Sequence, residues 1–397
     1  MNASTFALDF VPRWLEAVRA PSGGLFERLD LQGRPVAADE PRTSLVHART
    51  AFALAHLSMA TGDARLLDGA RHAYVFLDGS LRDENGGYRL STASSLRRSY
   101  DQSFALLALV TLRKADPQSV PQERIDACVA FIDGVLTDAR DGSLFEDDTM
   151  ARSGPNADDL RAQNPHMHML EAYLQAFEMT GEDHWLARAS ALVALVRRHF
   201  IDPATGAVRE FVGHDLAPAT GEAGARREPG HQYEWAWLLH RFADLGGDES
   251  ARQDAARMLA FADRFALRND GPLAGAPFDA LDADGHIVED THLLWPLTEA
   301  GKLHSALYLR TGNDAHRIRA ERIETLIFNC FFTTSDHPVF VNRVNGTGKV
   351  LWPEALTRLV YHVALFVTEA ERAGIRPHAA RPSVAAATKP ILEEERS

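Results

Sequence analysis

Apolar residues recur along most of the chain at positions i, i+3, i+4 and i+7, which is the spacing of an α-helix that buries at least one face. Six of these segments contain few charges and many Ala, Leu and aromatic residues, so we expect them to be buried helices. They cover residues 44–60, 100–112, 168–179, 233–242, 293–309 and 356–370. More highly charged helices, expected on the outside, are predicted over residues 64–77, 122–136, 183–199, 250–267 and 314–331.

Glycines separate the buried helices from the charged helices that follow them. Gly62, Gly181, Gly247 and Gly312 stand at such breaks, and each is followed within two residues by an Asp that can cap the next helix. Their spacing indicates a repeat of about six helical hairpins of roughly 60 residues each. Six inner and six outer helices close naturally into an all-α (α/α)6 barrel. An open solenoid is the alternative, and the short strand-like segments are expected to form hairpins at one mouth.

The repeat is expected to form a single domain over residues 1–374. The remaining residues, 375–397, are rich in Pro and Ala and then acidic, and are expected to form a loosely ordered tail. Of the 397 residues, 45% are hydrophobic and 24% are charged, which is typical of a soluble globular protein. The net charge of −13 argues against nucleic acid or an anionic membrane surface as a partner.

Cysteine content and apolar runs exclude further classes. Cys128 and Cys330 are too few for a disulfide framework, and no Cys/His pattern typical of structural zinc surrounds them. The N-terminus lacks the basic and then apolar pattern of a secretory leader, and no apolar run reaches the roughly 18 residues that cross a membrane. A cytoplasmic location is therefore expected.

Polar residues are concentrated near the starts of the buried helices, among apolar neighbours. In a barrel, equivalent points of successive repeats lie in one layer, so these residues are expected to meet around one central pocket. Histidine titrates near neutral pH and can exchange protons with a substrate, while aromatic rings can cover the C–H face of a sugar. The residues expected there are Arg49, Tyr100, Asn164, His166, His168, Glu171, His231, Glu234, Trp295, Glu299 and His362.

Five short motifs, taken in order, resemble those of the N-acylglucosamine 2-epimerase superfamily. They are Ala48-Arg49, residues 164–172 (NPHMHMLEA), residues 229–239 (PGHQYEWAWLL), residues 295–300 (WPLTEA) and Tyr361-His362. The resemblance extends over residues 5–374 and is greatest to the mannose isomerase branch. It implies a metal-independent sugar isomerase or 2-epimerase, without a cofactor, on an (α/α)6 barrel.

The resemblance also implies roles for the matched positions. His362 matches the histidine that removes or returns the C2 proton, and His231 matches a second acid/base group. His168 matches a third histidine near O1 and O5, and Arg49 matches the arginine that stabilises an enediolate. Hydroxyl-binding or histidine-orienting positions are implied for Asn164, Glu234 and Glu299, and further candidates for sugar contact are Tyr100, His166 and Trp295.

The chemistry expected of these residues is proton transfer at carbon. Loss of a proton α to an aldehyde requires stabilisation of the enediolate oxygen, which Arg49 and a protonated histidine can provide. Return of the proton to C1 gives the ketose, and return to the opposite face of C2 gives the epimer. No metal site is expected, because His166 and His168, two residues apart on a helix, face different sides.

We therefore predict an enzyme that interconverts D-mannose and D-fructose, or related sugars such as D-lyxose, as a monomer or homodimer. The alternative in the same family is a 2-epimerase acting on glucose or mannose, cellobiose or N-acylglucosamine. A glycoside hydrolase on the same barrel would need two carboxylates flanking the scissile bond. A helical-repeat scaffold that binds another protein would need a groove in place of a histidine-lined pocket.

One position departs from the family pattern. Four residues before His362, where family members often carry Gln or Ser, this chain has Arg358. A cation facing the pocket would favour an anionic or otherwise different sugar, whereas a cation pointing outward would not affect specificity.

Overall fold

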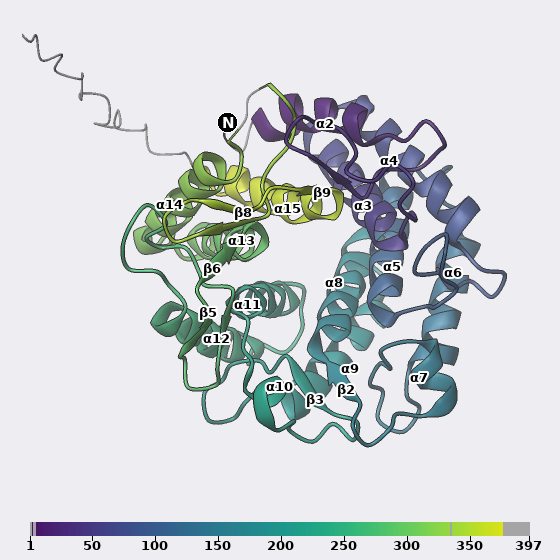
Figure 1. Ribbon diagram of the computed structural model, residues 1–397. Helices are drawn as coiled ribbons and strands as arrows, with labels where there is room; N and C mark the ends of the chain where they lie inside the picture. The colour runs from purple at the N-terminus through teal and green to yellow at the C-terminus, as the bar shows by residue number, and fades with distance from the viewer. Residues whose placement is uncertain (1, 3–4, 334–335, 376–397) are drawn as a thin grey trace, which may run out of the picture.

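The computed structural model describes residue 2, residues 5–333 and residues 336–375. Within these residues the buried helices form a closed ring, which Figure 1 shows from one end. Each inner helix contacts the next one along the chain, and the last contacts the first, so the fold is an (α/α)6 barrel and the open solenoid is excluded. The inner helices are α3 (Ser44–Thr61), α5 (Ser99–Ala115), α8 (Gln163–Thr180), α11 (Pro229–Asp244), α13 (Leu294–Thr311) and α15 (Val360–Arg372).

An outer layer of more polar helices covers the ring, as predicted. Each of five outer helices packs on the inner helix that precedes it in the chain. The inner helix α3 is buried at almost every position as far as Ser58, whereas α12 buries one narrow stripe that includes Met258 and Phe261. The five are α4 (Ala64–Phe76), α6 (Gln122–Phe131), α9 (Asp183–His199), α12 (Ala251–Phe265) and α14 (Asp314–Cys330).

The sixth outer position is filled by the N-terminal segment, which the sequence pattern did not predict as a helix of the repeat. The segment consists of a π-helical turn, η1 (Phe6–Phe10), and the helix α2 (Val11–Val18). η1 contacts α15 and α2 contacts α4, so the start of the chain closes the outer layer beside its end. The side chains of Phe6 and Trp14 are completely buried.

The predicted glycine breaks and helix caps are present between the layers. Gly62 ends α3 with φ of 75°, and Gly312 ends α13 with φ of 66°. Both lie in the left-handed region, which glycine adopts without steric cost. The next residues cap the following helices, since Asp63 accepts from the Arg65 N–H and Asn313 from the Ala315 N–H.

Short antiparallel strands lie at the end of the barrel where the inner helices begin. β1 (Arg28–Leu29) pairs with β9 (Ala355–Leu356), β2 (Leu160–Ala162) with β3 (Phe211–Gly213), and β4 (Ala280–Leu281) with β5 (Ile287–Glu289). A three-stranded sheet contains β6 (Thr291–Leu293), β7 (Arg343–Asn345) and β8 (Val350–Trp352). Because Leu356 belongs to β9 and residues 357–359 form the 3-10 turn η4 (Thr357–Leu359), α15 starts later than predicted.

A buried imidazole or amide near the start of four inner helices holds the backbone of the hairpin before it. The ring of His47 accepts the Leu25 N–H at 3.0 Å, and the ring of His166 accepts the Leu144 N–H at 3.0 Å. Gln102 bonds both backbone groups of Tyr88, and Gln232 bonds both backbone groups of Val208. We call these four side chains (His47, Gln102, His166 and Gln232) the hairpin anchors.

The predicted tail over residues 375–397 lies outside the described residues, apart from Ile375, whose side chain is buried. No helix in the described part of the chain is long and apolar enough to cross a lipid bilayer.

Close packing between inner helices predicts a specific sensitivity at Gly301. A Cβ atom added there would lie 2.6 Å from the Phe366 ring on α15 and 3.0 Å from an Ile323 methyl on α14. Gly301→Ala should therefore destabilise the protein by about 1–3 kcal/mol, the usual cost of overpacking, and lower the thermal midpoint measured by circular dichroism. Gly134→Ala is the matched control, because a Cβ there meets nothing within 4 Å. Equal midpoints for the two variants would contradict this packing.

Candidate active site

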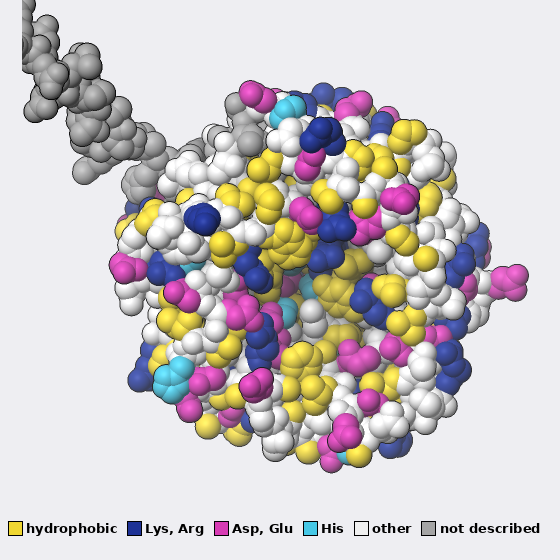
Figure 2. Space-filling model, viewed as in Figure 1, with side chains coloured by type: hydrophobic (Ala, Val, Ile, Leu, Met, Phe, Trp, Pro, Cys, Tyr) yellow, Lys and Arg dark blue, Asp and Glu magenta, His cyan; other side chains and the backbone are white. Residues whose placement is uncertain are grey.

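A cavity of about 240 Å³ opens at the mouth where the inner helices begin. Figure 2 shows this face hollowed near its centre, with histidine side chains at the bottom of the hollow. Eight of the ten predicted catalytic and substrate-binding residues line the cavity, namely Arg49, Tyr100, Asn164, His168, His231, Glu234, Trp295 and His362. The predicted convergence of distant repeats on one pocket is thus present for these eight.

His362, at the start of α15, is held by a carboxylate from the neighbouring inner helix. Its Nδ1 lies 2.7 Å from Oε1 of Glu299 on α13. Because a carboxylate accepts, this contact places the proton on Nδ1 and makes Nε2 an acceptor, which faces Nη1 of Arg49 at 3.4 Å. Burial, reinforced by the positive charge of Arg49, holds the pKa of His362 well below its usual value. His362 is therefore a neutral imidazole at neutral pH.

His231, at the start of α11, has the opposite electrostatic environment. Its Nδ1 lies 2.7 Å from Oε2 of Glu210 and 3.4 Å from Oε2 of Glu228. Burial alone would lower the pKa of His231, but the nearby carboxylates outweigh it and raise this pKa to about 9. His231 is therefore an imidazolium at neutral pH, and it lines the same cavity as His362.

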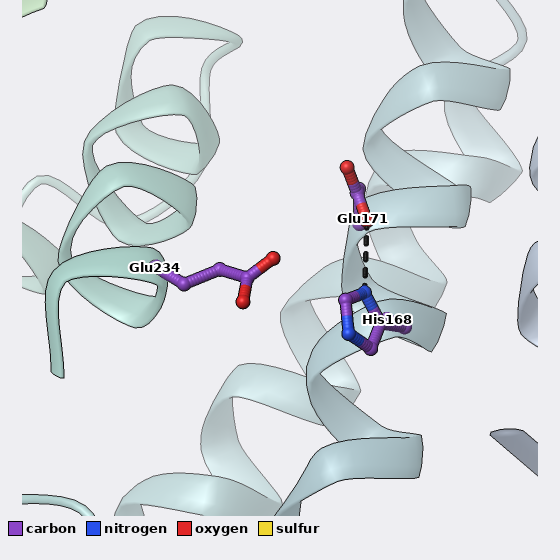
Figure 3. Close-up of side chains that lie close together, drawn as sticks. All are labelled: His168, Glu171 and Glu234. Carbon is purple, nitrogen blue, oxygen red and sulfur yellow. Dashed lines mark hydrogen bonds and ion pairs between the residues drawn. The ribbon is translucent and has the colours of Figure 1, made fainter. Parts of the chain in front are cut away.

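His168 forms a third imidazole–carboxylate pair, drawn in Figure 3. Its Nδ1 lies 3.0 Å from Oε2 of Glu171, one turn further along α8. Burial lowers the pKa of His168 to about 4 despite this bond, so the ring is neutral. Glu171 also accepts the hydroxyl of Tyr361, and the pKa of this carboxyl lies below its usual value although it is buried.

Glu234 approaches this pair from α11, across the barrel axis (Figure 3). Burial, together with the charges of Glu299 and Glu171, raises the pKa of Glu234 well above its usual value, which favours its protonated form. Glu234 Oε1 and Asn164 Oδ1 are buried without a partner among the described residues. Orphaned polar atoms in a cavity are suited to the hydroxyl groups of a ligand.

Arg49, Tyr100 and Trp295 complete the wall. Arg49 donates to the Tyr100 hydroxyl at 2.6 Å, and its guanidinium lies 4.1 Å from the centre of the Phe104 ring. The Trp295 ring centre lies 4.8 Å from that of His231 and 5.8 Å from that of His362. A flat apolar surface thus stands next to both histidines, as needed to cover one face of a sugar.

Two predicted substrate-binding residues do not line the cavity. His166 is a hairpin anchor, since its Nδ1 bonds the Ala162 carbonyl at 3.0 Å while its Nε2 accepts from Leu144. Residues i and i+2 of a helix face different sides. This explains why His166 points to the preceding hairpin whereas His168 points into the cavity. Glu299 lies behind His362 and contacts that ring and Lys302, so it orients a histidine.

Several residues of the site were not predicted. Glu210 and Glu228, the partners of His231, lie outside the predicted buried helices, and Glu210 directly precedes the strand β3. Lys302 is completely buried, forms an ion pair with Glu299 and stacks on Trp237 with Nζ 4.1 Å from the ring centre. Its position three residues after Glu299 is the signal that could have identified it. Asn342 and Trp352 line the mouth from the three-stranded sheet region.

Three groups of side chains around the cavity offer atoms that could also bind a metal ion. They are His168 with Glu171 and Glu234, Glu210 with Glu228 and His231, and Glu234 with Glu299 and His362. In each cluster the histidine already donates Nδ1–H to a carboxylate at hydrogen-bond distance. The side chains of each group are therefore arranged as a hydrogen-bonded imidazole–carboxylate pair.

A larger cavity, of about 630 Å³, lies among the C-terminal ends of the inner helices, at the other end of the barrel. Its arginines are all paired: Arg241 with Glu178, Arg310 with His240 and Arg372 with Glu369. Of the predicted site residues it contains only Glu171. The predicted site residues are therefore concentrated in the smaller cavity.

Comparison with known proteins agrees with this geometry. The sequence model of the family described as N-acylglucosamine 2-epimerase (GlcNAc 2-epimerase) matches residues 24–365. A mannose-6-phosphate isomerase of Rhizobium meliloti (strain 1021) is 30% identical over 303 residues, which cover 73% of this chain and 74% of the relative. A cellobiose 2-epimerase of Ruminococcus albus is 25% identical over 322 residues, 77% of this chain and 79% of the relative.

A solved structure of D-mannose isomerase superposes with a TM-score of 0.80 at 16% identity, covering 93% of this chain and 97% of that one. At this identity the superposition supports the barrel fold, while the family follows from the sequence matches. The chain belongs to the N-acylglucosamine 2-epimerase family and is an enzyme of that family.

Proposed function

We propose that the enzyme interconverts an aldose and its ketose through a cis-enediolate, with D-mannose and D-fructose as the parent pair and without a metal ion. The observation that carries the proposal is the set of three imidazoles around one cavity, each held at Nδ1 by a buried carboxylate. The names of the matched isomerases support the same reaction.

The protonation states of the histidines assign the steps. With an open-chain aldose in the cavity, the neutral His362 takes the C2 proton on Nε2 while the imidazolium of His231 gives a proton to O1. The guanidinium of Arg49, which already lies 3.4 Å from the base, stabilises the negative charge of the cis-enediolate before the proton from His231 reaches O1 and gives the enediol. His231 then takes the O2 proton, His362 returns its proton to C1, and the ketose forms with both histidines restored.

Other residues are assigned to binding. Asn164 and the protonated Glu234 supply an acceptor and a donor for hydroxyl groups, and Trp295 covers the C–H face. His168 lies opposite Glu234 and is suited to O1 or O5. A cavity of about 240 Å³ is slightly below the range of about 300–1,000 Å³ of sites for larger ligands, which favours a monosaccharide.

A 2-epimerase is the second candidate, because the matched relatives include a cellobiose 2-epimerase. It would use the same residues, with His231 returning a proton to the opposite face of C2. A glycoside hydrolase is not favoured, because Glu171, Glu210 and Glu299 are engaged with imidazoles and do not flank an open space as a pair of carboxylates would.

The reaction is tested by incubating the protein with mannose, fructose, glucose and cellobiose in D2O, with and without EDTA. We expect fructose from mannose with deuterium at C1, at the same rate in both conditions. Deuterium at C2 of an epimeric aldose would establish epimerisation instead. Loss of activity on chelation would exclude the metal-free route.

Replacing either central histidine should abolish turnover without unfolding the protein. For His362→Asn and His231→Asn we expect kcat/KM to fall by about 10²–10⁴-fold, the usual contribution of general acid–base catalysis. The matched control is His166→Asn on α8, which should lower the thermal midpoint because a hairpin anchor is lost. The folded fraction of this variant should retain wild-type kcat, and a fall as large as that of His362→Asn would contradict the assignment.

The pH profile should report the protonated state of His231. Since carboxylates raise the pKa of His231 to about 9, the imidazolium needed for the acid step is lost as the pH rises through about 9. We expect kcat/KM to fall over that range. Glu210→Gln removes one cause of the raised pKa, so the alkaline limb should move to lower pH. Glu40→Gln, at a surface pair with Arg28, should leave the limb in place.

A further inference from the structure

Arg358 is one of the residues that line the cavity. It lies on η4 and lines the wall together with Arg49, Tyr100 and His362. The side chain is half-buried, and among the described residues it forms no hydrogen bond and no ion pair within 4.0 Å. A guanidinium carries five N–H donors, so Arg358 presents an unused set of donors to the ligand space.

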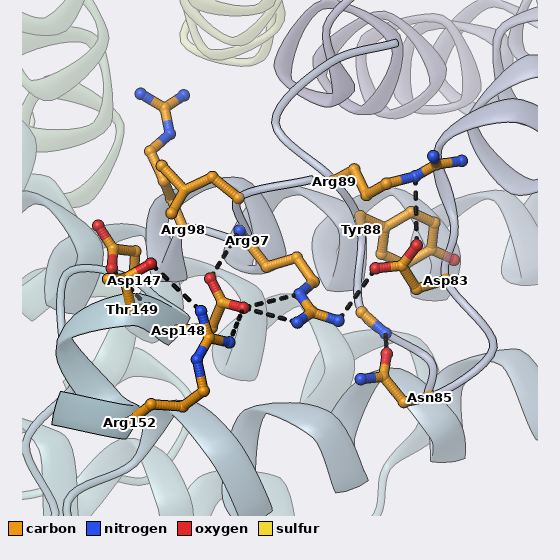
Figure 4. Close-up of polar contacts among 12 residues, drawn as sticks. Asp83, Asn85, Tyr88, Arg89, Arg97, Arg98, Asp147, Asp148, Thr149 and Arg152 are labelled. Carbon is orange, nitrogen blue, oxygen red and sulfur yellow. Dashed lines mark hydrogen bonds and ion pairs between the residues drawn. The ribbon is translucent and has the colours of Figure 1, made fainter. Parts of the chain in front are cut away.

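Other arginines around this mouth are neutralised by carboxylates. Arg97 bridges Asp148 and Asp83, Arg152 also bonds Asp148, and Arg89 pairs with Asp83, as Figure 4 shows. Arg98 bonds both carboxylate oxygens of Asp101, and Arg226 pairs with Glu228 and Glu289. Arg49, the other arginine that lines the cavity, also lacks a carboxylate partner but donates to the Tyr100 hydroxyl. Arg358 differs from all of these arginines because it forms neither kind of contact among the described residues.

The surroundings of Arg358 make its isolation unfavourable. Burial, and then the positive charge of Arg49, lower the pKa of this guanidinium. Tyr100 and Glu27 act in the opposite direction but do not outweigh them, and Arg98 adds a smaller lowering effect. A cation that is partly removed from water beside other cations is stabilised by an anion, and planar oxyanions bind guanidinium in bidentate fashion. The neutral hydroxyl groups of a sugar would not compensate the positive charge of Arg358, whereas an oxyanion would.

The location of Arg358 indicates which end of a sugar would carry the anion. Arg358 precedes the base His362 by four residues, which in helical geometry corresponds to about one turn and an axial rise of about 6 Å. That separation is comparable with the length of an open-chain hexose from C2 to its terminal carbon. A sugar with C2 at His362 can therefore extend its far end toward Arg358.

Resting on the isomerase function proposed above, we propose that the preferred substrate is an aldose with an oxyanion, such as a phosphate or a carboxylate, on its terminal carbon, which Arg358 binds. The reaction at C1 and C2 is unchanged by this substituent. Arg358 is then the residue that determines specificity, four residues before the base His362 in the wall of the same cavity.

The test compares mannose, mannose 6-phosphate and mannuronate with wild-type protein and Arg358→Gln at low ionic strength. We expect wild type to prefer at least one of the anionic sugars in kcat/KM. Arg358→Gln should lose about 10- to 100-fold on that sugar, mainly through KM, as expected for loss of charge-assisted hydrogen bonds. Its loss on mannose should be clearly smaller than its loss on that sugar. Arg152→Gln, an equal charge change on an exposed arginine of the same face, should retain the preference.

Two outcomes separate this inference from the proposed reaction. If none of the sugars is isomerised or epimerised, the proposed function fails, and binding of mannose 6-phosphate and mannuronate is then compared with that of mannose by the shift in thermal midpoint. A shift that wild type shows only with an anionic sugar, and that Arg358→Gln loses, supports the anion site. Equal preference for neutral and anionic sugars, or an equal loss on both in Arg358→Gln, overturns it.

Discussion

Three carboxyl groups buried at the centre of the barrel are the constraint on which the site depends. Glu171, Glu234 and Glu299 are shielded from water. In such a buried environment an isolated charge is strongly unfavourable. The structure meets this constraint with Lys302, which is also completely buried, and with hydrogen bonds from two imidazoles and Tyr361. The same bonds fix the orientation and tautomer of the cavity histidines His362 and His168. The contacts that stabilise the buried carboxyl groups are therefore also the contacts that orient the histidines of the cavity.

The opposite protonation states of His362 and His231 follow from the same physics. Both rings are buried and both bond a carboxylate at 2.7 Å. They differ in what lies around them, because Arg49 stands beside His362 whereas Glu228 adds a second carboxylate beside His231. One cavity thus contains a neutral ring and a charged ring of the same residue type. Such separation by environment is the usual way in which enzymes assign two roles to one kind of side chain.

The barrel and most of the pocket could be predicted from the sequence because both follow from short-range patterns. Helical periodicity located the inner helices, and the glycines at 62 and 312 marked their ends. The segment over 6–18 was missed because only one short amphipathic helix follows its π-helical turn. Glu210 could not be assigned because its role arises from His231, a partner that only the folded chain brings into contact. Lys302 was missed although its partner Glu299 lies one turn before it on the same helix. His166 was predicted to contact the substrate because it lies two residues from His168, which does line the cavity.

The hairpin anchors have a consequence for how such a barrel can diversify. On α3 and α8 the side chain that secures the loop and the side chain that meets the ligand are different residues, two positions apart, as in His47 and Arg49 or His166 and His168. Natural variation or laboratory selection can therefore exchange the reactive group on one helix while the rim remains supported. A mutant library confined to the second position of each such pair would explore new reactivity on an intact scaffold.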